Sequence, residues 1–265
     1  MKNNVKISAC IITKNEEKRI ERCLEHLQWV DEIVIVDSQS ADKTRQKAKE
    51  YAEKQGMKIR VFNQPFKSFD VQKNAAIERC TFDWILDIDA DEVVTGQLRD
   101  EIIQLLNKGT TKNGFYIPRE EYFLNKYLFD VPLIRLYQKG TAQYHGRVHE
   151  ILQLQGEKGT LKEKIIHENY LNTPNQIKNY LLKADLYSAI QAKALVDENG
   201  SSSLKILIQL LLKPVKNSLG LLFYKGLIFK GLPGILWSIF AGYTELLTLA
   251  KYYEGKQARR RINMK

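Results

Sequence analysis

The sequence predicts an α/β protein with a mostly parallel sheet, helices on both faces of that sheet, and a basic amphipathic helical region at the C-terminal end. Three observations lead to this fold class. Apolar runs typical of buried strands alternate with segments of helical periodicity up to residue 92. One of these runs ends in four carboxylates, within WILDIDADE at residues 84–92. The excess positive charge lies beyond residue 203.

The order of the predicted elements explains why the sheet should be parallel. The predicted strands are residues 5–13, 32–36, 59–62 and 84–87, and the helices between them are residues 16–27, 43–55 and 71–79. Strands that alternate with helices in this way form parallel sheets covered on both faces. Further strands are predicted at residues 114–119 and 133–137, and a helix from residue 174 to about residue 196.

Polar side chains follow three of these strands, at residues 13–16, 37–40 and 87–92. Ligands of open α/β sheets bind at the carboxyl ends of the strands. In an extended segment Asp89 and Asp91 point to the same side, because side chains alternate with period two. Such a pair suits Mg²⁺ or Mn²⁺, which also takes phosphate oxygens as ligands. The sequence therefore predicts a metal site for a bound diphosphate, and a solvated acidic turn is the alternative.

Four motifs carry a resemblance to a known family. They are IITKNE (residues 11–16), IVDSQSADKT (35–44), QKNA (72–75) and LDIDADE (86–92). Together they resemble family 2 glycosyltransferases, the inverting nucleotide-sugar enzymes of GT-A type, Rossmann-like fold. The resemblance is specific over residues 6–92 and looser beyond. One departure is Gln39, because the family usually has Gly at that position in Asp-Ser-Gly-Ser.

Later segments are similar to one subgroup of this family. RLY (residues 135–137), GRVHE (146–150) and the basic tail resemble the subgroup that includes lipopolysaccharide-core β-glucosyltransferases. That resemblance implies a UDP-linked hexose such as UDP-glucose as donor and a lipid-linked glycan such as lipopolysaccharide core as acceptor. The sequence lacks Gln-x-x-Arg-Trp, a motif of processive members, so transfer of a single sugar is expected.

The resemblance also assigns residues to the nucleotide-sugar. Asp37 is expected to accept a hydrogen bond from the nucleoside base, although it could instead form an Asx turn or cap a helix. The other expected donor-binding residues are Thr13, Asn15, Glu16, Lys73, Asn74 and Asp89. Thr13, Asn15 and Glu16 could alternatively serve only as a helix cap. Lys73 is expected at a phosphate, and Asn74 at the nucleotide or a neighbouring loop, unless both are solvated helix positions.

Inversion at an anomeric carbon needs one general base at the acceptor hydroxyl. The candidates after the acidic stretch are Glu120, Glu121, His149, Glu150 and His167. Resemblance to the His-Glu motif of the subgroup selects Glu150 as base, with His149 beside it as a catalytic residue or a metal ligand. A structural His-Glu pair is the alternative. The acceptor is expected to contact Arg119 and Arg135, on the two later strands.

The chain is predicted to divide at residue 203. Residues 1–203 form the catalytic domain, with a nucleotide-sugar-binding half (1–92) and an acceptor half (93–203), and residues 204–265 form a membrane-associating tail. Of the net charge of +10, an excess of nine positive charges lies in this tail. A uniform nucleic-acid-binding surface is therefore not expected.

The tail is predicted to lie on an anionic membrane and not to cross it. Its longest uncharged run, residues 231–244, has 14 residues, whereas a span needs about 20. Lysine-flanked apolar segments with Trp237 and Phe240 are typical of helices in the bilayer interface. Packing as core or against a second protomer is the alternative.

Cysteine usage and the N-terminal residues predict the compartment. The three cysteines form no CxxC pair, so neither a disulfide framework nor a zinc site is indicated. The apolar run near the N-terminus is too short for a signal peptide or a span. We therefore expect a cytoplasmic protein, peripheral on the inner face of the plasma membrane.

Two other classes of function remain open from the sequence. A nucleotidyltransferase would share the sheet and the acids, but it would usually have a Gly-rich phosphate loop after the first strand, and residues 13–16 contain no Gly. A membrane-binding module without enzymatic activity would need only the tail. It would leave the spacing of Asp37, Lys73, Asp89 and Asp91 unexplained.

Overall fold

A computed structural model describes residues 5–146, 151–171, 174–197 and 203–263. The chain forms two compact units. The first consists of Met1–Glu121 and Asp130–Asn169, and the second of Tyr122–Phe129 and Tyr170–Lys265. Residues 174–197 thus pack with the C-terminal helices, ahead of the predicted boundary at residue 203. The functional division at that boundary stays a prediction.

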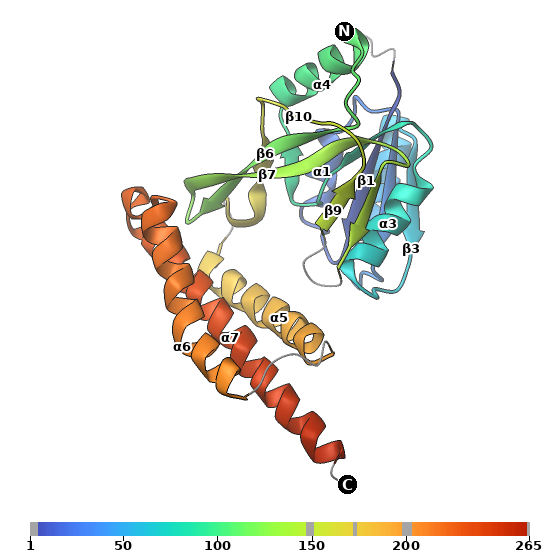
Figure 1. Ribbon diagram of the computed structural model, residues 1–265. Coiled ribbons are helices and arrows are strands. Elements are labelled where there is room, and N and C mark those ends of the chain that lie inside the picture. The colour runs from blue at the N-terminus through green and yellow to red at the C-terminus, as the bar shows by residue number, and fades with distance from the viewer. Residues whose placement is uncertain (1–4, 147–150, 172–173, 198–202, 264–265) are drawn as a thin grey trace. The chain divides into compact units, whose positions relative to one another are not determined.

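The four N-terminal strands pair with one another in parallel within the sheet (Figure 1). They are β1 (Ile7–Thr13), β2 (Glu32–Asp37), β3 (Ile59–Asn63) and β4 (Trp84–Asp87), in the order β3-β2-β1-β4. Their pairing is parallel throughout, with Thr13 opposite Asp37 and Cys10 opposite Asp87. The predicted strands are confirmed, and their carboxyl ends meet at one edge.

Beyond β4 the sheet continues with strands that follow β4 in the sequence. They are β7 (Lys126–Gln138), β6 (Gly114–Phe123), β11 (Ile165–His167) and β5 (Glu92–Val94), with β10 (Lys158–Thr160) beside β6. β7 is antiparallel to β4, and Leu86 faces Leu136. This register sets Arg135 beside Asp87. β11 runs parallel to β6 and antiparallel to β5, with His167 opposite Glu92. The predicted α/β class with a mostly parallel sheet is therefore confirmed, with antiparallel strands added on one side.

Helices cover both faces of this sheet, as predicted. α1 (Ile20–Glu25), α2 (Thr44–Gln55) and α4 (Gly96–Lys108) contribute side chains to a core with β1, β2 and β4. On the other face α3 (Phe69–Arg79) packs against the hairpin of β8 (Ala142–His145) and β9 (Ile151–Leu154). α1 is shorter than predicted, because residues 17–19 form turns.

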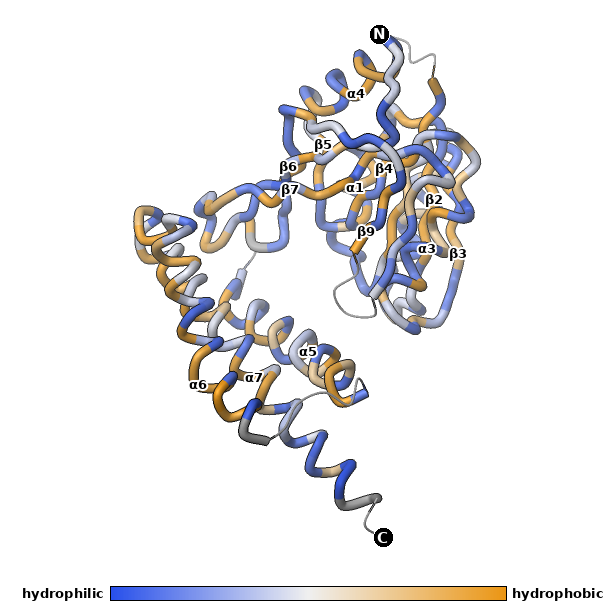
Figure 2. Tube along the Cα trace, viewed as in Figure 1, coloured by the Kyte–Doolittle hydropathy of each residue, from blue (hydrophilic) through white to orange (hydrophobic). Residues whose placement is uncertain are grey.

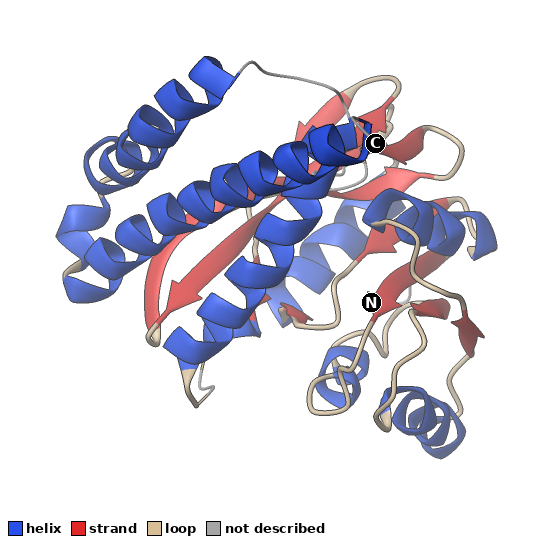
Figure 3. Ribbon diagram, turned by 90° about the horizontal axis from the view of Figure 1, so that it is seen from below, coloured by secondary structure: helices blue, strands red, loops and turns tan. Residues whose placement is uncertain are grey.

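The second unit is built on one long helix (Figure 3). α5 (Gln176–Asp197) and α6 (Ser203–Leu219) both pack against α7 (Leu232–Asn263). A π-helical turn η2 (Gly220–Tyr224) and a 3₁₀ turn η3 (Leu227–Lys230) connect α6 to α7, and η1 (Glu168–Tyr170) is a further short 3₁₀ turn. The helical C-terminal region is thus confirmed.

An aromatic cluster holds the second unit together. Phe123, which is fully buried, contacts Trp237 and Phe240 with ring centroids 5.4 and 6.1 Å apart, and Tyr180 lies 5.5 Å from Trp237. Trp237 and Phe240 are partly buried against this cluster, so part of each ring has a protein partner. Their insertion into a bilayer stays a prediction. The aromatic cluster thus supplies part of the apolar contact of these two rings.

Two helical segments of the second unit are long and apolar enough to cross a membrane. They are Lys205–Tyr224 and Leu232–Arg260. Both segments are longer than the uncharged run of 14 residues because they include lysines. A spanning helix can contain one or two lysines when their side chains reach the interface. Length and composition alone do not choose between a span and an interfacial helix.

Glu32 connects three segments of the first unit at the amino-terminal side of the sheet. Its fully buried carboxylate accepts hydrogen bonds from Ser8 Oγ at 2.7 Å and from the backbone N–H and hydroxyl of Thr81. Lys58 and Arg60 lie 3.1 and 3.2 Å away. Burial raises the pKa of Glu32, but the hydrogen bonds from Ser8 and Thr81 outweigh it and bring the pKa to about 2.

We predict that Glu32→Gln lowers the free energy of unfolding by about 1–3 kcal/mol near pH 7, because an amide cannot accept all of these hydrogen bonds. Half-exposed Lys58 and Arg60 add little, since water screens them. The folded-state pKa lies below the ordinary value, so this stabilisation is complete above about pH 4.5 and is lost as the pH falls toward 2. Urea unfolding of both proteins at pH 7 and pH 3 measures the difference. An unchanged difference at the two pH values would contradict this role.

Candidate functional site

The turn after β2 is built around the carboxylate of Asp37. Its Oδ1 accepts from the backbone N–H of Ser40 at 2.8 Å, and its Oδ2 accepts from the hydroxyls of Thr13 at 2.8 Å and Ser40 at 2.5 Å. Arg45 Nε lies 3.3 Å from Oδ1. Asp37 is fully buried, so it shapes the turn as the Asx-turn alternative anticipated. Its contact with a nucleoside base stays a prediction.

The segment after β1 docks onto the same turn. The ammonium group of Lys14 donates to the carbonyl oxygens of Ser38 at 2.6 Å and Gln39 at 3.0 Å. Asn15 exchanges hydrogen bonds with Ser40 and Ala41, and the backbone N–H of Glu16 donates to Thr44 Oγ1 at 2.7 Å. The predicted residues Thr13, Asn15 and Glu16 are thus brought together with Asp37 at one corner of the sheet edge.

Gln39 occupies the position at which family 2 glycosyltransferases usually have glycine, and its backbone adopts a conformation that glycine prefers. Gln39, which is exposed, has a φ of 57°, in the left-handed region. A side chain there costs roughly 1 kcal/mol. The turn therefore keeps a glycine-like shape despite the substitution, with local strain.

At the end of β4, Asp87 and Asp89 lie between two buried cations. Lys73 Nζ is 3.4 Å from Asp87 and 3.0 Å from Asp89, and Arg135 is 3.6 Å from Asp87 and 2.5 Å from Asp89. Burial lowers the pKa of Lys73, but the charges of Asp87 and Asp89 raise it well above its ordinary value. Lys73 is therefore a buried cation, contrary to the alternative of a solvated helix position.

Asp89 responds to the same charges in the opposite direction. Burial raises the pKa of this carboxyl, but Arg135 and Lys73 bring it well below its usual range. Its side chain keeps 28% of its surface exposed, whereas that of Asp87 keeps 4%. Asp89 is thus an ionised carboxylate at the surface of the cluster.

Glu92 extends the cluster toward β6. Its carboxylate accepts from Arg135 at 2.5 Å and Arg119 at 3.1 Å, and from the backbone N–H of Asp89 at 3.0 Å. Arg119 also contacts Glu121 Oε1, to which its Nε donates at 2.7 Å and from which a terminal guanidinium nitrogen lies 2.6 Å away. The expected acceptor-binding residues Arg119 and Arg135 therefore belong to the carboxylate cluster, and their contact with an acceptor stays a prediction.

Asp91 meets a histidine from β11. His167 Nε2 lies 3.4 Å from Asp91 Oδ2, and His167 Nδ1 lies 2.8 Å from Glu121 Oε2. Burial lowers the pKa of His167, but hydrogen bonds to Asp91 and Glu121 raise it to about 9. Glu121 and Asp91 thus hold the imidazole ring from its two nitrogens.

Tyr144 and Asn74 complete the cluster from the face of α3. The Tyr144 hydroxyl donates to Asp87 Oδ2, and Lys73 Nζ lies 5.1 Å from the centre of the Tyr144 ring. The Asn74 side chain bonds the backbone N–H and carbonyl of Tyr144, both at 2.8 Å. Asn74 therefore binds the neighbouring β8 strand, where a loop was one of its predicted partners, and its contact with the nucleotide stays a prediction.

Some site residues of the sequence analysis cannot be placed. His149 and Glu150 lie outside the described residues, so their roles stay predictions. Among the five base candidates, the structure joins Glu121 and His167 to the acids. Sequence reasoning gave no role to Tyr144 or Glu92. The signal for Glu92 was its place in the acidic stretch, whereas Tyr144 has no local motif.

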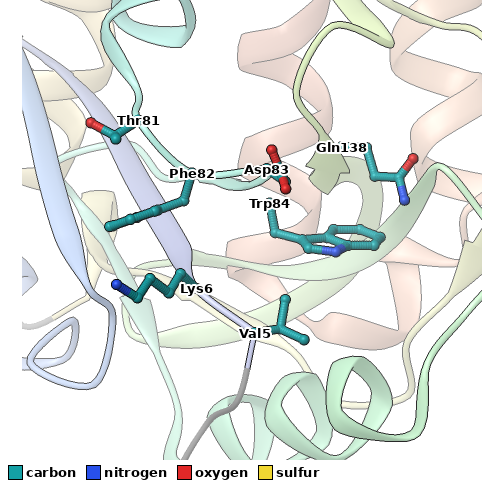
Figure 4. Close-up of a pocket in the computed structure, with 7 residues that line it drawn as sticks. All are labelled: Val5, Lys6, Thr81, Phe82, Asp83, Trp84 and Gln138. Atoms are coloured by element: carbon teal, nitrogen blue, oxygen red, sulfur yellow. The ribbon is translucent and has the colours of Figure 1, made fainter.

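A hollow of about 600 Å³ lies elsewhere (Figure 4). Its lining includes Lys6 just before β1, Phe82 just before β4, and Trp84, the first residue of β4. It therefore lies at the amino-terminal edge of these strands, opposite the acids. We place the functional site at the carboxyl-terminal edge, because the cluster of paired charges is there.

The model of the family described as Glycosyl transferase family 2 matches residues 8–149, more than half of the chain. The chain belongs to this family. The matched residues include the turn of Asp37 and the acids of β4, so the predicted resemblance is confirmed. The protein is a glycosyltransferase, which decides against the nucleotidyltransferase and the membrane-binding module.

Relatives extend the similarity over nearly the whole chain. The protein is 30% identical to the lipopolysaccharide core biosynthesis glycosyltransferase LpsC of Rhizobium meliloti (strain 1021), over 97% of this chain and 96% of LpsC. An uncharacterized glycosyltransferase of Rickettsia bellii (strain RML369-C) is 31% identical, over 94% of this chain and 86% of its own length.

A solved structure supports the fold. Mannosyltransferase PcManGT from Pyrobaculum calidifontis, solved in complex with GDP-Man and Mn²⁺, superposes with a TM-score of 0.55. The match covers 95% of this chain and 90% of PcManGT at 12% identity. At this identity the likeness establishes the GT-A-like fold alone.

The positive φ of Gln39 predicts how glycine at this position changes stability. Gln39→Gly should raise the free energy of unfolding by about 0.5–1 kcal/mol, because glycine adopts a positive φ without a Cβ clash. Gln46→Gly is the matched control, since Gln46 is an exposed residue inside α2, and there glycine should cost about 1 kcal/mol. Thermal and urea unfolding measure both. Destabilisation by Gln39→Gly would show that the side chain itself holds the turn.

Proposed function

We propose that this glycosyltransferase is metal-dependent and inverting, and that it transfers one sugar from a UDP-linked hexose, such as UDP-glucose, to a lipid-linked glycan. The observation that carries the proposal is the charge cluster at the carboxyl end of β4. It places Asp89 and Asp91 where an open α/β sheet binds its ligand. The donor-binding turn of Thr13, Asn15 and Asp37 follows β1 and β2 at the same edge.

The charges of the cluster support a divalent cation. Five carboxyl groups are connected through three cationic side chains and His167: Asp87, Asp89, Asp91, Glu92 and Glu121 with Lys73, Arg119 and Arg135. With its pKa of about 9, His167 is protonated at pH 7 in the metal-free protein, and the carboxylates then exceed the cations by one. A metal ion bound at His167 Nε2 would release that proton, and the excess would then be two. A divalent cation would balance this excess.

The donor atoms at Asp91 and His167 fit such an ion. Among the described residues no three His, Cys, Asp or Glu side chains form a ready coordination group, so the fit depends on the chemistry of these two. Mn²⁺ and Mg²⁺ accept carboxylate oxygens, and Mn²⁺ also accepts imidazole nitrogen. Asp91 and His167 would hold the ion, and Asp89 would add negative charge. The bound cation stabilises negative charge on the leaving diphosphate.

The protein's own residues prepare this site. Lys73 and Arg135 hold the carboxylate of Asp89 ionised and oriented, while 28% of its side-chain surface faces outward. Glu121 accepts at Nδ1 of His167, which leaves Nε2 directed at Asp91. We assign Lys73 to the electrostatic support of Asp89 and the diphosphate, and Asn74 to the position of β8.

The acceptor side of the proposal follows from the family resemblance. Glu150 is proposed as the general base that takes the proton of the attacking hydroxyl, with His149 beside it. A single displacement with one base inverts the anomeric configuration. Arg119, 18% exposed, is the better placed of the two proposed acceptor contacts, since Arg135 is 4% exposed.

A membrane location agrees with the acceptor class. The name of LpsC describes a glycosyltransferase of lipopolysaccharide core biosynthesis, and the two proteins align over nearly their full lengths. The second unit carries apolar helices and most of the excess positive charge. We propose a lipid-linked glycan, such as lipopolysaccharide core, as acceptor and the cytoplasmic face of an anionic membrane as location.

We predict that Asp91→Asn lowers transfer at least about 100-fold, because the amide keeps the shape but removes the charge that holds the cation. Affinity for Mn²⁺ in the presence of UDP, measured by calorimetry, should fall with it. Asp91 is a cleaner test than Asp89, since removal of Asp89 also leaves Lys73 and Arg135 short of a buried partner.

The matched control is Asp100→Asn. Asp100 is a surface carboxylate of α4 that pairs only locally, with Arg99 at 2.8 Å among its described contacts, so transfer should stay within about twofold. The assays use UDP-glucose and other nucleotide-sugars with added Mn²⁺. Full activity of Asp91→Asn without any metal requirement would overturn the proposal.

A further inference from the structure

We propose that the outward apolar face of α6, together with the turn that joins α6 to α7, lies in the interface of an anionic lipid bilayer, with the α6 axis along the membrane plane. This inference rests on the proposed membrane location and names the surface that achieves it. The surface consists of Leu207, Ile208, Leu211, Leu212, Val215 and Leu219 on α6, and of Phe223, Tyr224, Phe229 and Leu232 in the turn.

The α6 residues form one continuous exposed stripe. They are between 48% and 63% exposed, although all six are apolar. At about 100° per residue they fall within an arc of roughly 140° on the helix. Ile206, on the opposite side, is buried in a cluster with Tyr252 of α7. The helix therefore uses a different face to pack against α7 and leaves the apolar stripe exposed. Figure 2 shows that apolar residues recur along α6.

The turn continues this surface with larger side chains. Tyr224 and Phe229 are 91% and 89% exposed, and Phe223 and Leu232 are more than half exposed. Lys225 and Lys230 lie over the rings of Phe129 and Tyr127, at 6.0 and 4.5 Å from the ring centres. The turn thus presents aromatic side chains with lysines among them, an arrangement typical of the bilayer interface.

The charges around the apolar surface indicate which partner covers it. Residues 203–232 contain five lysines and no Asp or Glu. On the helix Lys205 and Lys216 lie at one border of the apolar stripe, by the same spacing of about 100° per residue. Lysines in that position reach phosphate headgroups while the leucines face the acyl chains. An anionic bilayer is therefore complementary to the whole surface.

Two other arrangements fit the charges less well. If α6 crossed the bilayer over Lys205–Tyr224, Lys213 and Lys216 would lie near the middle of the span, farthest from both interfaces, where a charge is costly. If a second copy of the chain covered the stripe with two-fold symmetry, lysines would face lysines with no acid on α6 between them. The bilayer interface satisfies both the apolar and the charged side chains.

The test measures how the full chain partitions onto phosphatidylcholine vesicles with and without phosphatidylglycerol. Leu211→Gln and Val215→Gln should each weaken binding to the anionic vesicles by about tenfold, because each removes an inserted apolar group. Both positions are exposed, so the far-UV circular dichroism spectrum and the thermal midpoint should not change. The matched control is Leu182→Gln on α5, whose residue is 61% exposed, much like Leu211 at 62%. It should leave binding unchanged.

The response of vesicle binding to salt and to alkaline washing distinguishes interfacial binding from a membrane span. Binding should fall when salt rises from about 0.1 M to about 1 M, and alkaline washing should release the protein. Three results would overturn the proposal: attachment that only detergent breaks, equal loss of binding with Leu182→Gln, or unchanged vesicle binding together with loss of self-association in Leu211→Gln. No sugar donor is present in this assay. Its failure therefore leaves glycosyl transfer intact, whereas failure of the Asp91→Asn test leaves vesicle binding intact.

Discussion

The guanidinium group of Arg135 is the interaction on which the site depends. It lies against Asp87, Asp89 and Glu92, which come from one short acidic stretch and would otherwise repel each other in a buried position. Arg135 reaches them because β7 runs antiparallel beside β4, with Leu136 opposite Leu86. The acids can therefore crowd the end of β4 only when β7 completes the sheet beside it. Fold and charge balance are formed by the same strand pairing.

The first half of the fold was predictable because its signals are local. Apolar runs such as EIVIVD and WILD specify buried strands, and alternation with helices specifies a parallel sheet. The place of Asp37 and Asp89 at the carboxyl edge followed from the same pattern. The antiparallel position of β7 could not be read in this way, because nothing near residue 126 indicates a partner at residue 84. Arg135 was consequently expected at the acceptor and is found among the acids.

Long-range contacts also explain the other differences. Glu121 and His167 are 46 residues apart, and only the pairing of β11 with β6 and β5 brings them to Asp91. Trp237 and Phe240 have the composition of membrane-inserting residues, yet Phe123 from the β6–β7 hairpin provides them with a protein partner. The exposed leucines of α6 have no such partner among the described residues. The apolar composition of the tail indicated an exposed apolar surface. Tertiary contacts determine that α6 residues form this surface, and that Trp237 and Phe240 contribute to the aromatic cluster.

The central claim is that Asp91 and His167 hold a divalent cation beside the charge cluster. Anomalous scattering from crystals soaked with MnCl₂ and UDP tests it most directly. The account predicts one strong manganese peak within coordination distance of the Asp91 carboxylate and His167 Nε2, with the UDP diphosphate on its other side. A manganese peak bound by other residues, or UDP bound at the acids with no manganese peak, would contradict it.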